Sequence, residues 1–111
     1  MSSDVNQEAT VKWHSICAVQ EIPQLGARTV RTGVMEVALF RLSDDRIMAV
    51  DNQCPHQQGP LAEGIVSGAT VICPLHARKI NLQSGAVLPP DSGRVNTYPV
   101  KVENGQVLLR L

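Results

Sequence analysis

The chain has 111 residues and ten basic against ten acidic side chains, so its formal net charge is zero. This length suffices for one domain with a modest core and leaves no room for a second catalytic domain. The balanced charge, without any long basic run, argues against a nucleic-acid partner. No apolar stretch approaches the roughly 20 residues that span a bilayer, and residues 1–10 lack the hydrophobic region of a signal peptide. We therefore expect a soluble, cytoplasmic protein that binds neither nucleic acid nor a membrane.

The first half of the chain has the pattern of an all-β protein. Aromatic residues make up only 3% of the sequence, whereas Val, Leu and Ile are abundant, which favours an aliphatic core between sheets. Residues 1–10 are polar and are expected to form a flexible tail before a single domain over 11–111. The strands predicted in this half span 11–17, 27–31, 34–42 and 46–50, and the last two form a hairpin around a turn at 43–45.

The amino-acid composition changes at the start of the second half. Between residues 52 and 92, five prolines and four glycines punctuate short apolar pieces, which predicts an inserted, loop-rich subdomain. Within it, 70–73 and 79–82 are predicted strands, whereas 61–66 is either a helical turn or irregular. Alternating residues around an Asn-Gly turn then predict a closing β-hairpin near 97–111. No sustained helix is expected.

Two segments of the insert each pair one cysteine with one histidine: Cys54 with His56, and Cys73 with His76. Two half-sites of matching design indicate one metal centre between two loops. Zinc is one candidate, because it accepts two sulfur and two nitrogen ligands in structural sites. Common zinc sites, however, group the cysteines on one element and the histidines on another, whereas both pairs here are mixed. A two-iron centre whose irons take different ligand types suits mixed pairs better.

The sequences CPHQQGPL at 54–61 and CPLH at 73–76 resemble the two cluster-binding loops of Rieske domains, and the resemblance covers about residues 11–111. It implies an antiparallel β sandwich or partial barrel with the cluster-binding subdomain inserted at 52–92, and one [2Fe–2S] cluster per chain. By the same resemblance, Cys54 and Cys73 would bind the buried iron, and His56 and His76 the outer iron. A third loop containing Pro89-Pro90 would cover the cluster.

Further stretches resemble, more narrowly, the small subunit of the assimilatory NAD(P)H-dependent nitrite reductase; they lie at 22–26, 29–33, 59–66 and 96–102. In that family a large subunit with flavin, siroheme and a [4Fe–4S] cluster reduces nitrite to ammonium in nitrate assimilation. The resemblance implies a redox subunit that partners this large subunit. The chain has neither a Gly-rich dinucleotide fingerprint nor room for siroheme, so we do not expect it to be catalytic alone.

Two alternatives remain open from the sequence. One is a free Rieske ferredoxin that donates electrons to an aromatic-ring dioxygenase and works with an oxygenase and its reductase. The other is a non-redox interaction subunit whose β scaffold holds a structural metal such as zinc.

The loops also carry an expectation about reduction potential. High-potential Rieske proteins of the cytochrome bc type have an extra cysteine in each ligand loop, and a serine and a tyrosine after the second histidine that donate hydrogen bonds around the cluster. Here those places hold Gln57, Gln58 and Gly59, then Leu75, and finally Arg78 and Ile80. Losing these donors disfavours the reduced state, so we expect a potential in the lower part of the roughly −150 to +300 mV range of Rieske centres.

Five further residues receive simpler interpretations. Arg78 is expected to face solvent or to meet an acidic partner surface. Cys17 is expected to be a small buried hydrophobe, and His14 a histidine outside the ligand set. Gly59 and Gly64 are expected to serve backbone geometry.

Overall fold

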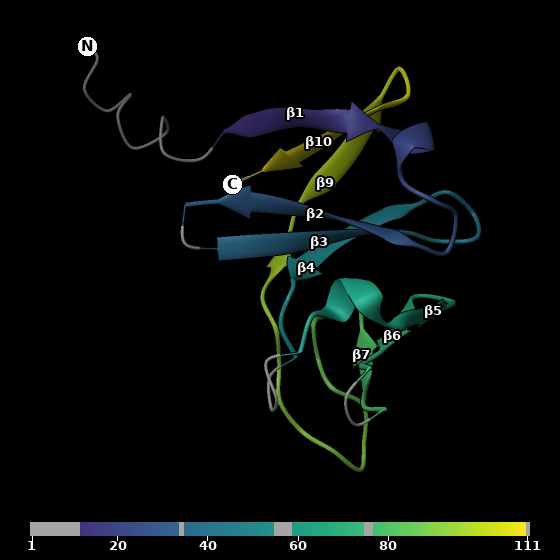
Figure 1. The fold of residues 1–111 in the computed structure, drawn as a ribbon, viewed down its shortest axis with the longest axis vertical. Coiled ribbons are helices and arrows are strands. Elements are labelled where there is room, and N and C mark those ends of the chain that lie inside the picture. Colours follow the sequence, from purple (N-terminus) through teal and green to yellow (C-terminus); the bar gives the residue numbers. More distant parts are fainter. Residues whose placement is uncertain (1–11, 34, 55–58, 75–76, 111) are drawn as a thin grey trace.

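The computed structural model describes residues 12–33, 35–54, 59–74 and 77–110, which form three antiparallel sheets (Figure 1). The first sheet has the order β1 (Trp13–Ala18), β10 (Gln106–Arg110), β9 (Val100–Glu103). The second has the order β2 (Ala27–Thr32), β3 (Met35–Arg41), β4 (Ile47–Asp51), β8 (Thr97–Tyr98). The third has the order β5 (Ile65–Ser67), β6 (Thr70–Ile72), β7 (Lys79–Asn81). The expected all-β architecture is confirmed.

Helical structure is confined to two short 3-10 turns among the described residues, η1 (Val19–Glu21) and η2 (Leu61–Glu63). Within the same residues, no helix is long and apolar enough to cross a membrane. The predicted tail over 1–10 lies outside the part of the chain that the structure describes.

The strand β3 explains how one short chain builds two cores. Successive side chains on a strand point to opposite faces, so a strand covered on both sides reads as a continuous apolar run. Val37 and Leu39 join the core between the first and second sheets, whereas Ala38 and Phe40 join the core between the second and third sheets. All four side chains are fully buried. The second sheet is therefore the shared middle layer.

The partners of β3 in each core come from different parts of the sequence. The core toward the first sheet, which we call the base core, is completed by Cys17, Ile22, Ile47, Ala49, Val107 and Leu109. The core toward the third sheet, which we call the insert core, is completed by Leu42, Val50, Cys54, Leu61, Val66, Val71, Cys73, Ile80, Leu82, Val87 and Val95. Both cysteines of the predicted metal centre belong to the insert core.

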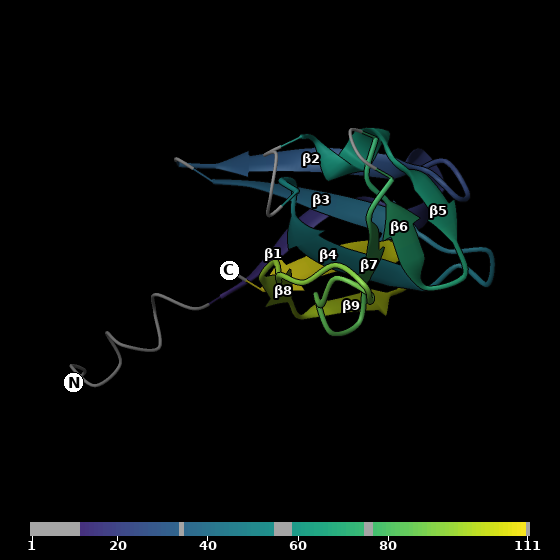
Figure 2. The same ribbon diagram turned by 90° about the horizontal axis from the view of Figure 1, so that it is seen from below.

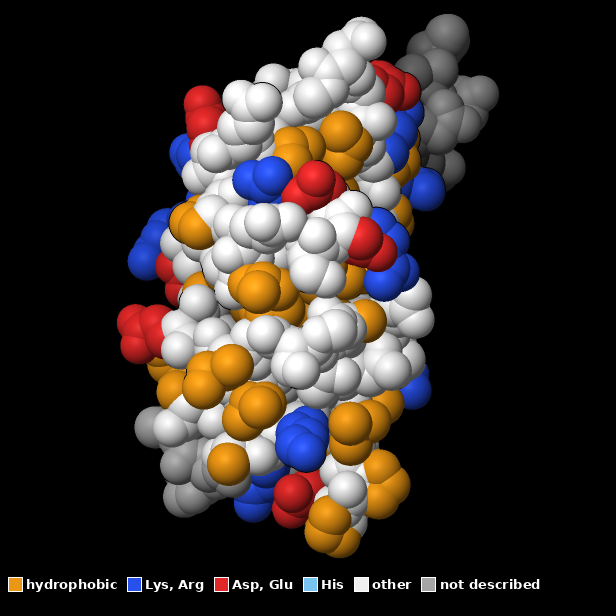
Figure 3. All heavy atoms as spheres, turned by 90° about the vertical axis from the view of Figure 1, so that its right-hand side faces the viewer, with side chains coloured by type: hydrophobic (Ala, Val, Ile, Leu, Met, Phe, Trp, Pro, Cys, Tyr) orange, Lys and Arg blue, Asp and Glu red, His pale blue; other side chains and the backbone are white. Residues whose placement is uncertain are grey.

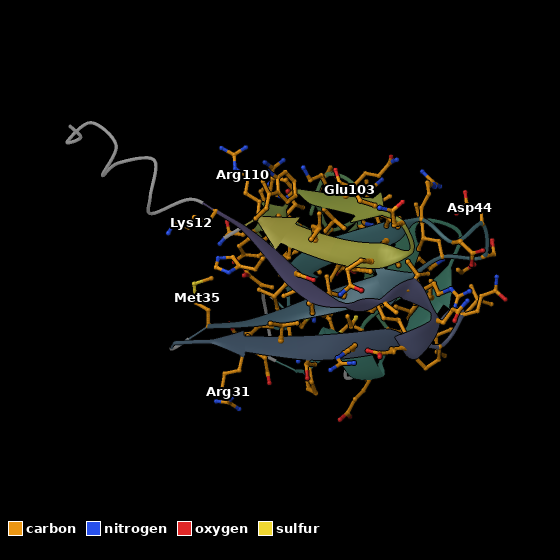
Figure 4. All side chains as sticks on the ribbon, turned by 90° about the horizontal axis from the view of Figure 1, so that it is seen from above. Lys12, Arg31, Met35, Asp44, Glu103 and Arg110 are labelled. Carbon is orange, nitrogen blue, oxygen red and sulfur yellow. The ribbon has the colours of Figure 1, made fainter. Side chains whose placement is uncertain are left out.

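The figures place these layers along the long axis of the molecule. The first sheet lies at the top of Figure 1 and the third sheet with η2 at the bottom, and Figure 2 shows the third sheet from below. Figure 4 looks from the opposite end, where the labelled charged side chains, Arg31 and Glu103 among them, point outward from the first and second sheets. The insert thus forms one end of the protein.

Most predicted elements are confirmed within a residue or two of their bounds, and two details are wrong. The segment 61–66 contains the predicted helical turn but then continues into β5, which was not predicted. The predicted C-terminal hairpin is interrupted by Pro99, so that β8 pairs with β4 in the second sheet while β9 pairs with β10 in the first. Proline lacks a backbone N–H, which makes it a natural point for a strand to change sheets.

Candidate metal centre

The first ligand loop begins directly after β4. Cys54 is fully buried, and its backbone N–H donates a 2.8 Å hydrogen bond to the carbonyl of Gly59. This bond joins the two ends of the segment that contains residues 55–58, which lie outside the described residues. Gly59 is itself buried, in keeping with the backbone role expected for it.

The second ligand loop repeats this closure. Cys73 follows β6, is 1% exposed, and donates its N–H to the carbonyl of Arg78 over 2.7 Å. In both loops the cysteine N–H therefore bonds to the carbonyl five residues later. The second loop has one more bond, from the Ala77 N–H to the Cys73 carbonyl at 3.0 Å, and Ala77 adopts a left-handed φ of 56° to make it. The described ends of the two loops are thus joined by hydrogen bonds of the same spacing.

Both cysteines lie in the insert core beside aliphatic side chains such as Leu61, Val71 and Ile80. An apolar environment excludes water from a bound metal centre and controls its redox potential. The structure brings Cys54 and Cys73 into one core, as expected. It does not describe His56 or His76, which belong to the segments 55–58 and 75–76, and the places of these two side chains stay predictions.

Asn52 anchors the first ligand loop. Its buried amide nitrogen donates to Glu36 Oε1 on β3 at 3.1 Å, and its amide oxygen accepts the Ala62 N–H of η2 at 2.7 Å. Its backbone N–H also bonds to the Glu36 carbonyl at 2.9 Å. Asn52 thus ties both flanks of the loop to the middle sheet. No motif in the sequence singled out Asn52, although a polar residue that follows an apolar strand next to the ligand motif is a usable signal.

Gly64 lets the turn η2 pack against β6. Its φ is −80°, which any residue can adopt, so conformational freedom is not the reason for a glycine here. An added Cβ would lie 2.3 Å from the Ile72 carbonyl oxygen and 2.9 Å from a methyl of Val71. The expected backbone role of Gly64 is confirmed, and it consists of close approach to the strand that leads to Cys73.

Arg78 is placed differently from what we expected. Its side chain is only 22% exposed and its Nε lies 3.5 Å from Oδ1 of Asp91, on the loop that follows Pro89-Pro90. Of the two expectations for Arg78, a solvent-facing side chain does not agree with this low exposure, and the described residues include an acidic partner for it in the same chain. Thirteen positions separate the two residues, so no local sequence pattern links them. The ion pair joins the second ligand loop to the proline loop.

The proline loop lies beside the second ligand loop. A small cavity of about 160 Å³ is lined by Ala77 and Lys79 on one side and by Leu88, Pro89, Pro90 and Asp91 on the other. The peptide bond between the two prolines is cis, and both side chains are exposed. That this loop covers a metal centre stays a prediction.

Cys17 and His14 lie on β1, in the first sheet, and take no part in the ligand loops. Cys17 is 4% exposed in the base core, and burial raises the pKa of its thiol, with the nearby charge of Arg28 lowering it in part. Its expected role as a small buried hydrophobe is confirmed. His14 is exposed and pairs with Leu109 of β10.

Comparison with known families agrees with this arrangement. The family model described as a Rieske-like [2Fe–2S] domain matches residues 12–110. The chain belongs to the Rieske-like [2Fe–2S] domain family. It is therefore an electron-transfer domain whose family carries a Rieske cluster. The described part of this Rieske domain fits such a cluster, because two buried cysteines from two identically closed loops offer the thiolates that iron–sulfur centres require.

Relatives of this Rieske domain include both dioxygenase ferredoxins and nitrite reductase proteins. The 3-phenylpropionate/cinnamic acid dioxygenase ferredoxin subunit of Photorhabdus laumondii is 38% identical over 96 residues, covering 85% of this chain and 90% of that protein. The NAD(P)H nitrite reductase large subunit of Klebsiella oxytoca is 36% identical over 100 residues, which cover 86% of this chain and 10% of that protein. A crystal structure assigned as an NADH-dependent nitrite reductase small subunit from Mycobacterium tuberculosis superposes with a TM-score of 0.82 at 27% identity, covering 91% and 96% of the two chains.

Proposed function

We propose that this domain holds one Rieske [2Fe–2S] cluster through Cys54, His56, Cys73 and His76. The observation that carries the proposal is the matching closure of the two loops, each running from a buried cysteine N–H to the carbonyl five residues on. In this assignment the cysteines bind the iron within the insert core, and the histidines bind the iron at the end of the molecule. When bound, the cluster takes up and releases a single electron.

The protein residues supply position and environment for that exchange. The loop-closing bonds hold Cys54 three residues after β4 and Cys73 directly after β6, and Asn52 fixes the first loop to the middle sheet. Leu61, Val71 and Ile80 exclude water from the cysteine side of the site. A rigid, apolar setting reduces the reorganisation that accompanies a change of charge, which favours rapid electron exchange.

We further propose that the domain serves as the cytoplasmic Rieske small subunit of an NAD(P)H nitrite reductase, with a large subunit that carries flavin and siroheme. Support comes from the matching segment within the Klebsiella oxytoca large subunit, because it indicates that a domain of this kind works in direct association with that enzyme. The similarity to the Mycobacterium tuberculosis protein assigned as a small subunit is consistent with this. The domain would transmit electrons and would not reduce nitrite alone.

A second candidate is a free ferredoxin that donates electrons to an aromatic-ring dioxygenase. The observation in its favour is the Photorhabdus laumondii ferredoxin subunit, whose length corresponds to that of this chain and whose identity, at 38%, is no lower than that of the nitrite reductase relative.

Deletion of the gene in its native host separates these roles. For a nitrite reductase subunit, the deletion strain loses growth on nitrite as the sole nitrogen source, and a plasmid copy restores growth whereas a C54S copy does not. The tagged protein also copurifies with a large protein that has flavin and siroheme absorbance. Unimpaired growth on nitrite, with electron delivery by the reduced protein to a ring-hydroxylating oxygenase, would establish the ferredoxin role instead.

A further inference from the structure

Arg78 has buried hydrogen-bond donors that the described protein atoms do not satisfy. Its Nε and Nη1 are inaccessible to solvent and have no hydrogen-bond partner among the described residues. The Asp91 carboxylate lies 3.5 Å from Nε, which makes an ion pair but not a well-formed hydrogen bond. Two donor groups of one guanidinium are thus enclosed next to the second ligand loop, whose closing carbonyl belongs to the same residue.

Such an arrangement is costly unless an acceptor is present. A guanidinium keeps its positive charge at any pH at which proteins fold, and enclosing its N–H groups without acceptors is strongly unfavourable. Asp91 supplies one negative charge but is 42% exposed, so solvent screens a large part of its attraction. The environment therefore favours an additional, negatively charged hydrogen-bond acceptor near Arg78. Cysteine and cluster sulfurs would meet that requirement if the proposed centre is held at this end of the insert.

We propose that Arg78, which is paired with Asp91, sets the reduction potential of the centre by directing its enclosed N–H groups and its positive charge toward the cluster-binding loops. The proposal rests on the ligand set proposed above. Reduction adds one electron to the cluster from an external donor, and no bond of the protein is formed or broken. The cluster environment becomes more negative by one charge, and the cation of Arg78 stabilises that state relative to the oxidised one.

The surroundings of Arg78 enhance this effect. Exposed charges close to an interface with water are strongly screened, whereas enclosed charges are screened much less. At the lower end of the face in Figure 3, hydrophobic side chains lie around a group of Lys/Arg and Asp/Glu side chains. Lys79, the next residue and the first of β7, has an exposed side chain and provides a comparison charge beside Arg78.

The ion pair offers a test based on the direction in which each substitution shifts the midpoint potential. If Arg78 and Asp91 only latch two loops together, removing either end breaks the same contact and shifts the potential in the same direction. If their charges act on the cluster, R78M lowers the midpoint potential and D91N raises it. At a fixed solution potential, we expect R78M to lower the ratio of reduced to oxidised protein about tenfold. This corresponds to a fall of about 59 mV in the midpoint potential of a one-electron couple. We expect a change of about twofold to threefold, in the opposite sense, for D91N.

The measurement is a dithionite titration of anaerobically purified, cluster-containing protein, followed by visible absorbance and EPR. R78K retains the charge and should stay within about threefold of the wild-type ratio, while K79M should change that ratio less than about twofold. Shifts of the same sign in R78M and D91N, or equal shifts in R78M and K79M, overturn the inference. If R78M fails to take up a cluster, D91N decides alone, and a lowered or unchanged midpoint contradicts the inference. A wild-type protein without a cluster would instead refute the proposed function.

Discussion

The hydroxyl of Tyr98 on β8 donates a 2.6 Å hydrogen bond to Oδ1 of Asp51, the last residue of β4. The other carboxylate oxygen of Asp51 accepts the backbone N–H of Asn96 at 3.0 Å. One carboxylate thus clamps the short strand β8 to the end of β4, three positions before Cys54. Because β8 and β4 share only two register pairs, these side-chain bonds contribute much of what holds this edge together.

Replacing Tyr98 with phenylalanine tests this clamp. The variant leaves one lone-pair site of a charged carboxylate without its donor, so we expect the free energy of unfolding at pH 8 to fall by about 1–2 kcal/mol. Urea unfolding measures the change. As a control, S15A removes a hydroxyl that accepts a hydrogen bond from Gln106 on the exposed part of the first sheet, and it should cost less. Equal losses in the two variants would contradict a special role for the clamp.

The same contact makes stability depend on alkaline pH. Burial, followed by the hydrogen bond and charge of Asp51, raises the pKa of Tyr98 above its ordinary value of 10. As pH rises through about 10, the unfolded chain loses the tyrosine proton while the folded protein keeps it, so stability falls. The chain has a single tyrosine, so its tyrosinate absorbance reports Tyr98 directly. We expect titration well above pH 10 in the folded protein, and a narrowing stability gap between the wild type and Y98F.

We expect Asn52 to affect both the stability of the protein and the iron content through the first ligand loop. Substitution by alanine leaves the half-buried Ala62 N–H and Oε1 of Glu36 without the hydrogen bonds that Asn52 makes to them, and we expect a loss of about 2 kcal/mol in unfolding free energy. Iron bound per chain should also decrease. N96A is a matched control, because the Asn96 side chain is exposed and its backbone, which bonds to Asp51, is retained. Full iron content in N52A would show that the loop does not depend on this anchor.

Alanine substitutions at Gly64 and Gly68 distinguish the stability cost of close packing from that of backbone strain. In G64A the new Cβ would lie 2.3 Å from a backbone oxygen of β6, which cannot move without displacing the strand that leads to Cys73. We expect a loss of at least about 2 kcal/mol in unfolding free energy, together with reduced iron content. In G68A the Cβ meets nothing within 4 Å, and only the left-handed φ of +59° opposes it, at a cost of about 1 kcal/mol. A smaller loss in G64A than in G68A would count against the packing explanation.

The features predictable from the sequence are those with local patterns. The ligand segments at Cys54 and Cys73 depend on residue spacing, and β3 is evident because both its faces are buried in aliphatic cores. The pairing of Arg78 with Asp91 and the anchoring of η2 by Asn52 join residues far apart in sequence, so only the folded chain shows them. Pro99 was visible in the sequence, but the alternation on either side of it resembles one strand.

The reduction potential is expected in the lower part of the roughly −150 to +300 mV range of Rieske centres. Position 80 holds a fully buried isoleucine that donates no hydrogen bond, and the loops have no cysteines beyond the proposed ligands. If Arg78 acts as proposed above, it would offset only part of this loss, because a single cation would stand in place of the two hydroxyl donors and the extra loop cysteines of the high-potential proteins. Protein-film voltammetry or a mediated titration gives the value directly. A midpoint well above about +100 mV would contradict the expectation.

The identity of the metal centre can be decided with three cysteine variants. We expect anaerobically purified protein to contain two irons and two acid-labile sulfides per chain, and the reduced protein to have an EPR signal with the low average g value of mixed His/Cys ligation. C54S and C73S should lose iron, sulfide and the signal together, because each removes a proposed thiolate ligand. C17S replaces the buried thiol of the base core with a hydroxyl, which should lower stability by about 1–2 kcal/mol and leave the iron content unchanged. Stoichiometric zinc in place of iron, lost in the same two variants, would instead assign these cysteines to a structural site.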